Sequence, residues 1–333
     1  MTPCQGRLGH TAVQVGELSF GAAGIGNLFT PVTDDQAEQT VTAAWEAGMR
    51  YFDTAPHYGL GLSERRLGAA LRHRPRDEYV LSTKVGRLLE PADTGGTDLT
   101  AGFAVPATHR RVWDFSADGV RRSLADSLER LGVDRVDIAY LHDPDDHVEQ
   151  ALDEAYPALE RLRGEGVLGA IGVGMNQAET PARFVRETDI DAVLLAGRYS
   201  LLDQHGLADL LPLAVDRGIG VVVGGVFNSG LLADPRPGAP FDYATAPEHL
   251  LARAVDLQTV CTRHGVPLRA AALRFPLGHP AVTSVLVGPR SAAEAEDAAT
   301  LLHRPVPDAL WEEIKERGLL PAHVPTPTHP EHP

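Results

Sequence analysis

The fold is decided by residues 49–85, which read MRYFDTAPHYGLGLSERRLGAALRHRPRDEYVLSTKV. Two apolar runs, MRYFDT (49–54) and EYVLSTKV (78–85), flank a stretch with helical periodicity, LSERRLGAALRH (62–73). Near-continuous apolar runs are typical of strands that are buried on both faces, as in parallel sheets covered by helices. The segment therefore predicts a strand–helix–strand unit with parallel strands.

The same alternation recurs along the rest of the chain. We expect strands at residues 17–21, 49–54, 78–85, 136–142, 167–174, 192–197, 219–225 and 283–288. We expect helices at residues 34–48, 62–73, 116–132, 148–166, 179–188, 206–217, 248–264, 267–277 and 291–302. Pro157 predicts a kink or a two-part helix within residues 148–166. Eight such units favour an α/β fold of the closed (β/α)₈ TIM-barrel type over the alternative, an open doubly wound sheet.

The two ends of the chain differ from this alternation. Residues 7–18, RLGHTAVQVGEL, predict a small N-terminal β-hairpin that caps the barrel floor. Residues 1–317 then form one domain. Residues 318–333 are rich in Pro and His, and we expect them to be a disordered tail.

Composition excludes several classes of protein. The 333 residues carry a net charge of -15, which disfavours nucleic acid and anionic membranes as partners. The two cysteines, Cys4 and Cys261, provide neither a disulfide framework nor the spacing of a zinc site. The sequence has no apolar stretch of about 20 residues and no signal-peptide core, so we expect a cytoplasmic protein.

Polar side chains end three consecutive predicted strands. Asp53, Lys84 and His142 occupy these ends, and Tyr58 follows Asp53 in the loop. Chemistry in a barrel gathers at the C-terminal ends of the strands. A buried lysine needs a partner, which Asp53 can be, and an ammonium next to a phenol is expected to lower the pKa of Tyr58. Tyr58 could then exchange a proton with a substrate oxygen that His142 orients.

Other interpretations of these motifs remain open. Each of the four side chains could be structural when taken alone. HDPDDH (142–147) could form a metal cluster and indicate a metal-dependent barrel hydrolase, but its carboxylates also suit the start of a helix. We expect no metal. GAAGIG (21–26) does not have the spacing of a dinucleotide-binding fingerprint.

With these residues in place, the sequence resembles the aldo-keto reductase superfamily over about residues 7–302. Asp53, Tyr58, Lys84 and His142 match the catalytic tetrad of that family in type and order, and FDTAPHYGLGLSERRLG (52–68) resembles its signature. The resemblance implies a (β/α)₈ barrel that transfers a hydride between a carbonyl or alcohol carbon and an extended NAD or NADP.

The resemblance also implies cofactor positions. Asn176 and Arg198 correspond to contacts of the nicotinamide amide, and Phe227 to the ring that stacks on nicotinamide. Asn228, Ser229, Gly230 and Leu231 would follow the pyrophosphate. The adenosine end would meet Gly288, Arg290, Ser291, Glu294 and Asp297. A carboxylate at Glu294 would repel a 2′-phosphate and bind a free 2′-hydroxyl, so NAD is expected to be preferred, with NADP possible.

The substrate expectations follow from the same resemblance. GLGLSERRLG (59–68) and GGVFNSGLLA (224–233) resemble the subgroup that oxidises aldoses at C1 to lactones, and pyridoxal-oxidising members are relatives. Alternatives are a general aldehyde or ketone reductase and a cofactor-binding subunit without catalysis. The long segment 86–115 is expected to cover the site, with Trp113 and Phe115 near the sugar, and Tyr243 and His142 as further substrate contacts.

Overall fold

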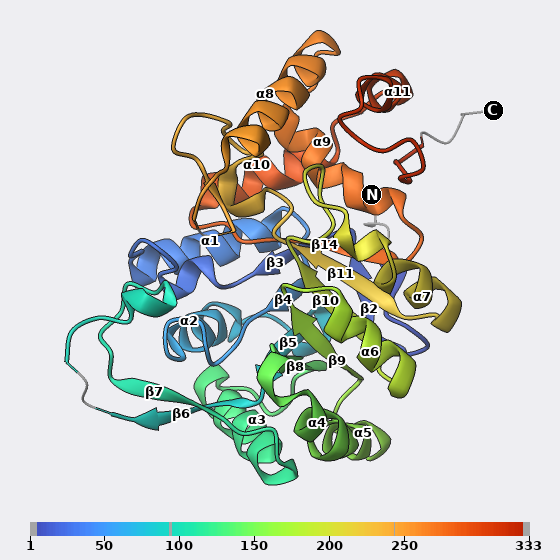
Figure 1. Ribbon diagram of the computed structural model, residues 1–333. Coiled ribbons are helices and arrows are strands. Elements are labelled where there is room, and N and C mark those ends of the chain that lie inside the picture. Colours follow the sequence, from blue (N-terminus) through green and yellow to red (C-terminus); the bar gives the residue numbers. More distant parts are fainter. Residues whose placement is uncertain (1–4, 93–94, 243, 329–333) are drawn as a thin grey trace.

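The computed structural model describes residues 5–92, 95–242 and 244–328 and contains a closed barrel of parallel strands (Figure 1). The barrel strands are β3 (Leu18–Gly21), β4 (Tyr51–Asp53), β5 (Val80–Val85), β8 (Ile138–His142), β9 (Ala170–Met175), β10 (Ala192–Ala196), β11 (Gly220–Gly224) and β14 (Val282–Val287). Pairing of β14 with β3 closes the ring. The eight predicted strands and the barrel are confirmed.

Helices surround the barrel on the outside (Figure 1). They are α1 (Asp34–Glu46), α2 (Leu62–Leu71), α3 (Ala117–Leu131), α4 (Val148–Gln150), α5 (Tyr156–Gly164), α6 (Glu179–Glu187), α7 (Leu210–Arg217), α8 (Glu248–Arg263), α9 (Leu268–Arg274), α10 (Ala292–Leu302) and α11 (Asp308–Glu316). Thr33 and Ser116 cap α1 and α3, each accepting a backbone N–H with its side-chain oxygen. The predicted break near Pro157 is confirmed, because a π-helical turn, Ala151–Ala155, separates α4 from α5.

The N-terminal hairpin lies where the sequence predicts it. Strands β1 (Gln5–Arg7) and β2 (Gln14–Gly16) pair antiparallel. Leu8 and Val15 are buried in the same cluster as the barrel residues Ile138 and Ala170, which lie at the N-terminal ends of their strands. The hairpin therefore caps the floor of the barrel and leaves the opposite rim for a site.

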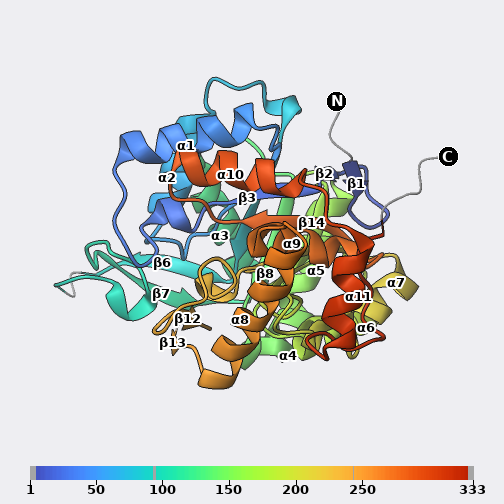
Figure 2. The ribbon, with the colours of Figure 1, turned by 90° about the horizontal axis from the view of Figure 1, so that it is seen from above.

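Two further hairpins lie on the opposite side of the molecule from β1 and β2 (Figure 2). Strands β6 (Arg87–Pro91) and β7 (His109–Trp113) belong to the segment between β5 and α3. Strands β12 (Pro240–Phe241) and β13 (Ala244–Thr245) belong to the segment between β11 and α8. The chain thus places its longest excursions near the C-terminal ends of the barrel strands.

The segment after α11 differs from the expectation of a disordered tail that begins at residue 318. Leu320 and Val324 are buried, and Arg253 on α8 donates two hydrogen bonds to the carbonyl oxygen of Leu319. The backbone at Pro327 lies against Gly278 so closely that no Cβ would fit there. The expectation is therefore wrong for residues 318–328, because these apolar side chains and backbone contacts attach the segment to the helices around the barrel. Residues 329–333 lie outside the described residues.

This packing predicts a large stability effect at Leu320. Leu320→Ala should lower the free energy of unfolding by about 2–5 kcal/mol, because it leaves a cavity under a fully buried side chain. His323→Ala is the matched control: His323 is exposed on the same segment, so its loss should cost within about 0.5 kcal/mol. Denaturant unfolding measures both, and equal stability of the two variants would contradict the packing described.

Candidate active site

The rim of the barrel brings together the side chains that the sequence singles out. β4, β5 and β8 are neighbours in the sheet, and Asp53, Lys84 and His142 lie at or next to their C-terminal ends. Tyr58 lies in the loop between β4 and α2 and receives a hydrogen bond from Lys84. The predicted meeting of an acid, an ammonium, an imidazole and a phenol is therefore present in the structure.

The ammonium of Lys84 is the centre of this group. Its Nζ donates to Asp53 Oδ2 at 2.5 Å, to the carbonyl oxygen of Thr54 at 3.0 Å and to the hydroxyl of Tyr58 at 3.0 Å. An ammonium has three N–H donors, so all of them are used. The other carboxylate oxygen of Asp53 accepts a bond from Ser82 Oγ at 2.7 Å. The side chain of Lys84 is only 2% exposed and that of Asp53 only 1%. Water cannot solvate either charge, so these hydrogen bonds take the place of hydration.

The electrostatics of Tyr58 differ from the expectation. Burial works to lower the pKa of Lys84, but attraction by Asp53 and Tyr58 outweighs it, so the net shift is upward and the group stays an ammonium. Burial raises the pKa of Tyr58, and the charge of Lys84 only partly opposes it. The expectation of a lowered pKa for Tyr58 is wrong for the protein alone. Desolvation destabilises the phenolate form more than the positive charge of Lys84 stabilises it. Tyr58 is thus a neutral phenol with a proton to give.

His142 is the second polar group facing Tyr58. The two ring centroids are 5.8 Å apart with the planes nearly perpendicular. Burial, followed by repulsion from Arg87 and Lys84, lowers the pKa of His142 well below its usual value, so the ring is neutral. Its buried Nδ1 has no hydrogen-bond partner among the residues that the structure describes. The neutral imidazole of His142 and the phenol of Tyr58 can therefore both form hydrogen bonds to the same substrate oxygen, each from its own side.

The segment 86–115 reaches the site through Arg87, and the two aromatic residues expected to contact substrate differ in their exposure. Trp113 is 45% exposed, and the guanidinium of Arg87 lies 5.4 Å from its ring centroid. Phe115 is fully buried in the apolar core against Gly86, so the expectation that it contacts substrate is not supported. Tyr243 lies outside the described residues.

Several residues at the site were missed by the sequence reasoning. Arg87 forms an ion pair with Asp143, the residue after His142. Phe103 packs 6.1 Å from Tyr58 and 5.2 Å from His57, measured between ring centroids. The path of a long connecting segment does not follow from any periodicity in its sequence. The sequence therefore carried no signal for the contacts of Arg87 and Phe103.

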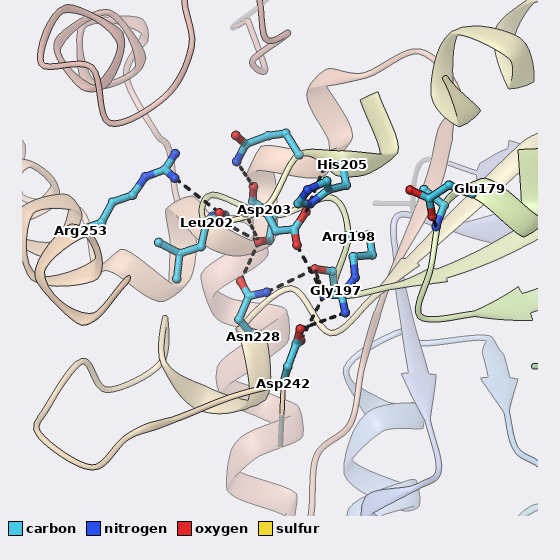
Figure 3. Close-up of polar contacts among 12 residues, drawn as sticks. Glu179, Gly197, Arg198, Leu202, Asp203, His205, Asn228, Asp242 and Arg253 are labelled. Carbon is cyan, nitrogen blue, oxygen red and sulfur yellow. Dashed lines mark hydrogen bonds and ion pairs between the residues drawn. The ribbon is translucent and has the colours of Figure 1, made fainter. Parts of the chain in front are cut away.

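Two of the cofactor positions that the resemblance suggests, Arg198 and Asn228, already have partners in the protein. Arg198 bonds Asp242 at 2.9 Å and Asp203 at 3.4 Å, which joins the end of β10 to the β12–β13 hairpin (Figure 3). The amide of Asn228 accepts from Ser200 Oγ at 2.6 Å and donates to the carbonyl of Gly197 at 3.3 Å (Figure 3). The side chain of Asn228 is therefore structural, and its backbone N–H also bonds within the turn, to the carbonyl oxygen of Gly225 at 2.9 Å. Asn176 is exposed just after β9.

Residues 227–231 form a turn with unusual backbone angles. Asn228, Ser229 and Gly230 have φ values of 47°, 59° and 115°. Left-handed backbone at non-glycine residues is costly and collects at functional sites, where successive N–H groups can face an anion. Phe227 is partly buried, whereas the side chain of Leu231 is fully buried and its N–H bonds the carbonyl oxygen of Asn228 at 3.2 Å.

The start of α10 is the other candidate anion site. Ser291 caps the helix by accepting from the N–H of Glu294 at 3.2 Å, and Glu294 accepts from the N–H of Arg290 at 2.8 Å. The guanidinium of Arg290 bonds Thr30 Oγ1 at 3.0 Å. Gly288 is exposed just after β14, and Asp297 is paired with Arg269.

The residues that the structure describes contain neither a metal-ligand cluster nor a membrane-spanning helix. Across residues 5–92, 95–242 and 244–328, no three His, Cys, Asp or Glu side chains are arranged to hold a metal ion, and HDPDDH (142–147) is no exception. In the same part of the chain, no helix combines the length and the apolar character that crossing a membrane requires.

Residues 17–318 match the family model described as "Aldo/keto reductase family". The chain belongs to the aldo/keto reductase family. It is 47% identical over 310 residues to "D-threo-aldose 1-dehydrogenase" from Pseudomonas sp., covering 91% of this chain and 94% of that protein. It is 41% identical to "Pyridoxal 4-dehydrogenase" from Microbacterium luteolum, covering 94% and 97%.

A solved family member has the same fold. The "aldo-keto reductase AKR11C1 from Bacillus halodurans" superposes with a TM-score of 0.75 at 27% identity, covering 96% of this chain and 97% of that one. Family membership and these relatives make the chain an oxidoreductase that acts on a small molecule. The predicted family is therefore confirmed.

The Lys84–Asp53 pair predicts a specific pattern of stability. Lys84→Met should lower the free energy of unfolding by about 3–5 kcal/mol, because it leaves a buried carboxylate without its counter-charge. Lys84→Met/Asp53→Leu removes both charges, so the double variant should be more stable than either single variant. Lys315→Met, at the only other lysine, should change stability little because Lys315 is partly exposed.

Denaturant unfolding of the four variants measures the coupling between the two side chains. Strictly additive losses in the double variant would show that the two charges are not stabilised by each other.

Proposed function

We propose that the chain is an NAD(P)-dependent dehydrogenase that oxidises C1 of an aldose, in its ring form, to a lactone. The observation that carries the proposal is the Lys84 ammonium, whose three hydrogen bonds fix the Tyr58 hydroxyl next to a neutral His142. The similarity to a protein named D-threo-aldose 1-dehydrogenase supports the choice of substrate.

The side chains divide the reaction between them. Nicotinamide, when bound, would supply the acceptor for the hydride that leaves C1 with its electron pair. Tyr58 takes the proton of the C1 hydroxyl in its deprotonated, phenolate form and becomes the neutral phenol, while His142 holds the same substrate oxygen by a hydrogen bond. Lys84 stabilises the phenolate form of Tyr58, and Asp53 keeps Lys84 charged and in place. In the opposite direction the phenol returns its proton to a carbonyl oxygen.

The charges around the site suit a neutral, hydroxyl-rich substrate. Each cation has a carboxylate partner: Lys84 has Asp53, Arg87 has Asp143 and Arg111 has Asp98. His142 is neutral as well. The matched pairs leave no unbalanced positive charge for an anionic substrate, whereas donors and acceptors remain for hydroxyl groups. Trp113, exposed on β7, would then offer its ring to the apolar face of the sugar.

The residues present fit an extended nicotinamide dinucleotide. The start of α10 offers a helix N-terminus for a phosphate, and the left-handed turn at residues 228–230 lies between β11 and the β12–β13 hairpin, where the resemblance puts the pyrophosphate. We assign the nicotinamide end to Asn176, Arg198 and Phe227, and the pyrophosphate to residues 228–231, as the family resemblance implies. Gly288, Arg290, Ser291, Glu294 and Asp297 would hold the adenosine end.

Absorbance of NADH during incubation with NAD⁺ and a panel of aldoses tests the proposal directly. Pyridoxal belongs in the same panel, because a relative at 41% identity is named for that substrate. We expect NADH formation with an aldose and a lactone as the product. Turnover of pyridoxal alone would move the assignment to that second substrate, and turnover of neither would contradict both.

Tyr58→Phe should lower kcat for aldose oxidation by about 10²–10⁴-fold, because it removes the group that takes the proton. Burial raises the pKa of Tyr58, so the wild-type rate should rise with pH into the alkaline range, and this rise should vanish in the variant. Tyr156→Phe, on α5, is the matched control and should leave kcat unchanged. A Tyr58→Phe enzyme with the wild-type rate would rule out Tyr58 as the base.

Glu294 is expected to make NAD the preferred cofactor, since its carboxylate lies at the proposed adenosine end. Glu294→Arg should shift the kcat/KM ratio toward NADP by at least about tenfold, or about 1.4 kcal/mol. Glu294→Gln keeps an acceptor for the Arg290 N–H and should move the ratio less. Glu312→Arg, exposed on α11, controls for the change of net charge. A wild-type preference for NADP would contradict the assignment.

A further inference from the structure

His57, the residue before Tyr58, borders the same space as the two groups that would bond the reacting oxygen. Its ring centroid lies 6.0 Å from that of Tyr58 and 5.6 Å from that of His142. The planes of His57 and His142 are nearly perpendicular, at 80°. The ring of His57 is partly exposed. A polar atom on this ring is therefore placed to meet a substrate next to its reacting oxygen.

Arg111 on β7 holds His57 in one orientation. Its Nε donates to His57 Nδ1 at 2.6 Å, and its Nη2 donates to the carbonyl oxygen of His57 at 3.0 Å. Its Nη1 donates to Asp98 Oδ1 at 2.8 Å, which fixes the guanidinium in turn. An arginine does not lose its Nε proton in proteins, so His57 Nδ1 has to be the acceptor. The proton of the neutral imidazole is therefore on Nε2.

The groups around His57 also keep it neutral. Those that face it are Tyr58 on its own loop, Lys84 on β5, Arg87 on β6, Arg111 on β7 and His142 on β8. Burial, followed by repulsion from Arg87, Arg111 and Lys84, lowers the pKa of His57 to about 2. At any working pH the ring thus offers one N–H, and among the described residues no acceptor is bonded to Nε2.

We propose that His57 is a specificity-determining residue that donates its Nε2–H to the substrate oxygen on the carbon next to the reacting carbon. In the proposed function, Tyr58 and His142 bond the oxygen on the reacting carbon. The ring of His57, which lies beside both of them, would then meet the oxygen on the adjacent carbon. Arg111 and Asp98 are positioning residues that set the tautomer. The inference rests on the proposed function, and it selects substrates with a hydroxyl at C2 over their 2-deoxy analogues.

Steady-state kinetics with an aldose and its 2-deoxy analogue test the contact. The wild type should prefer the parent sugar, because the analogue leaves the Nε2–H of His57 without a substrate acceptor once the bound sugar has displaced water from it. His57→Phe should lower this preference in kcat/KM by about tenfold or more, mostly through KM. Arg111→Met should lower it in the same sense, whereas Arg110→Met, at an exposed neighbour on β7 paired with Glu90, should leave it unchanged.

Nitrogen-15 NMR of the imidazole rings tests the tautomer without any need for activity. The resonances of His57 are assigned as those missing from His57→Phe. In the wild type they should show a proton on Nε2 that does not titrate between about pH 5 and pH 9, and in Arg111→Met the ring should titrate closer to its usual pKa of about 6.5. A proton on Nδ1, or a wild-type ring that titrates near neutrality, would overturn the proposal.

The two kinds of failure can be told apart. A wild type that turns over no aldose contradicts the proposed function, and with it the substrate assigned to His57. A wild type that oxidises an aldose with a preference that His57→Phe leaves unchanged contradicts the role of His57 alone.

Discussion

The buried ammonium of Lys84 is the interaction on which the rest of the site depends. A charge inside a barrel is tolerated only when every N–H finds an acceptor, and Lys84 finds three: Asp53, Thr54 and Tyr58. The first two anchor the charge to the β4 strand and its loop, and the third fixes the phenol. The requirement that stabilises the fold at this point is thus the one that orients the proton-transfer group. The same ammonium lets a buried Tyr58 act as a base. When the phenolate forms, the positive charge of Lys84 lies within hydrogen-bonding distance of it and stabilises it.

The barrel supplies the other constraint. Because β4, β5 and β8 are hydrogen-bonded neighbours, the side chains at their C-terminal ends must meet. The floor is closed by the hairpin that buries Leu8 and Val15, so chemistry is confined to the rim. Above the rim, the β6–β7 segment adds ion pairs that reach down to the site. Arg87 joins Asp143, and Arg111 joins both Asp98 and His57. The result is a site rich in hydrogen-bonding groups whose formal charges are matched in pairs.

Sequence reasoning was accurate where periodicity and strand order determine position. The strands, the hairpin, the break near Pro157 and the meeting of Asp53, Lys84 and His142 follow from pattern alone. It failed where the outcome depends on three-dimensional packing. Phe115 turns into the core because of the close approach of Gly86, and Leu320 and Val324 attach a segment whose composition suggests disorder. The pKa of Tyr58 depends on the balance between burial and the charge of Lys84, which a sequence does not give. His57 gains its importance from Arg111, a residue 54 positions away on strand β7.

The most direct test of the account follows the hydrogen atom on C1. An aldose that carries deuterium at C1 is oxidised by the wild-type enzyme in the presence of NAD⁺, and mass spectrometry locates the label in the products. We expect the deuterium in NADH and not in the lactone, and a slower reaction of the labelled substrate when hydride transfer limits the rate. Deuterium released to water, or a product that forms without stoichiometric NADH, would contradict hydride transfer at this site.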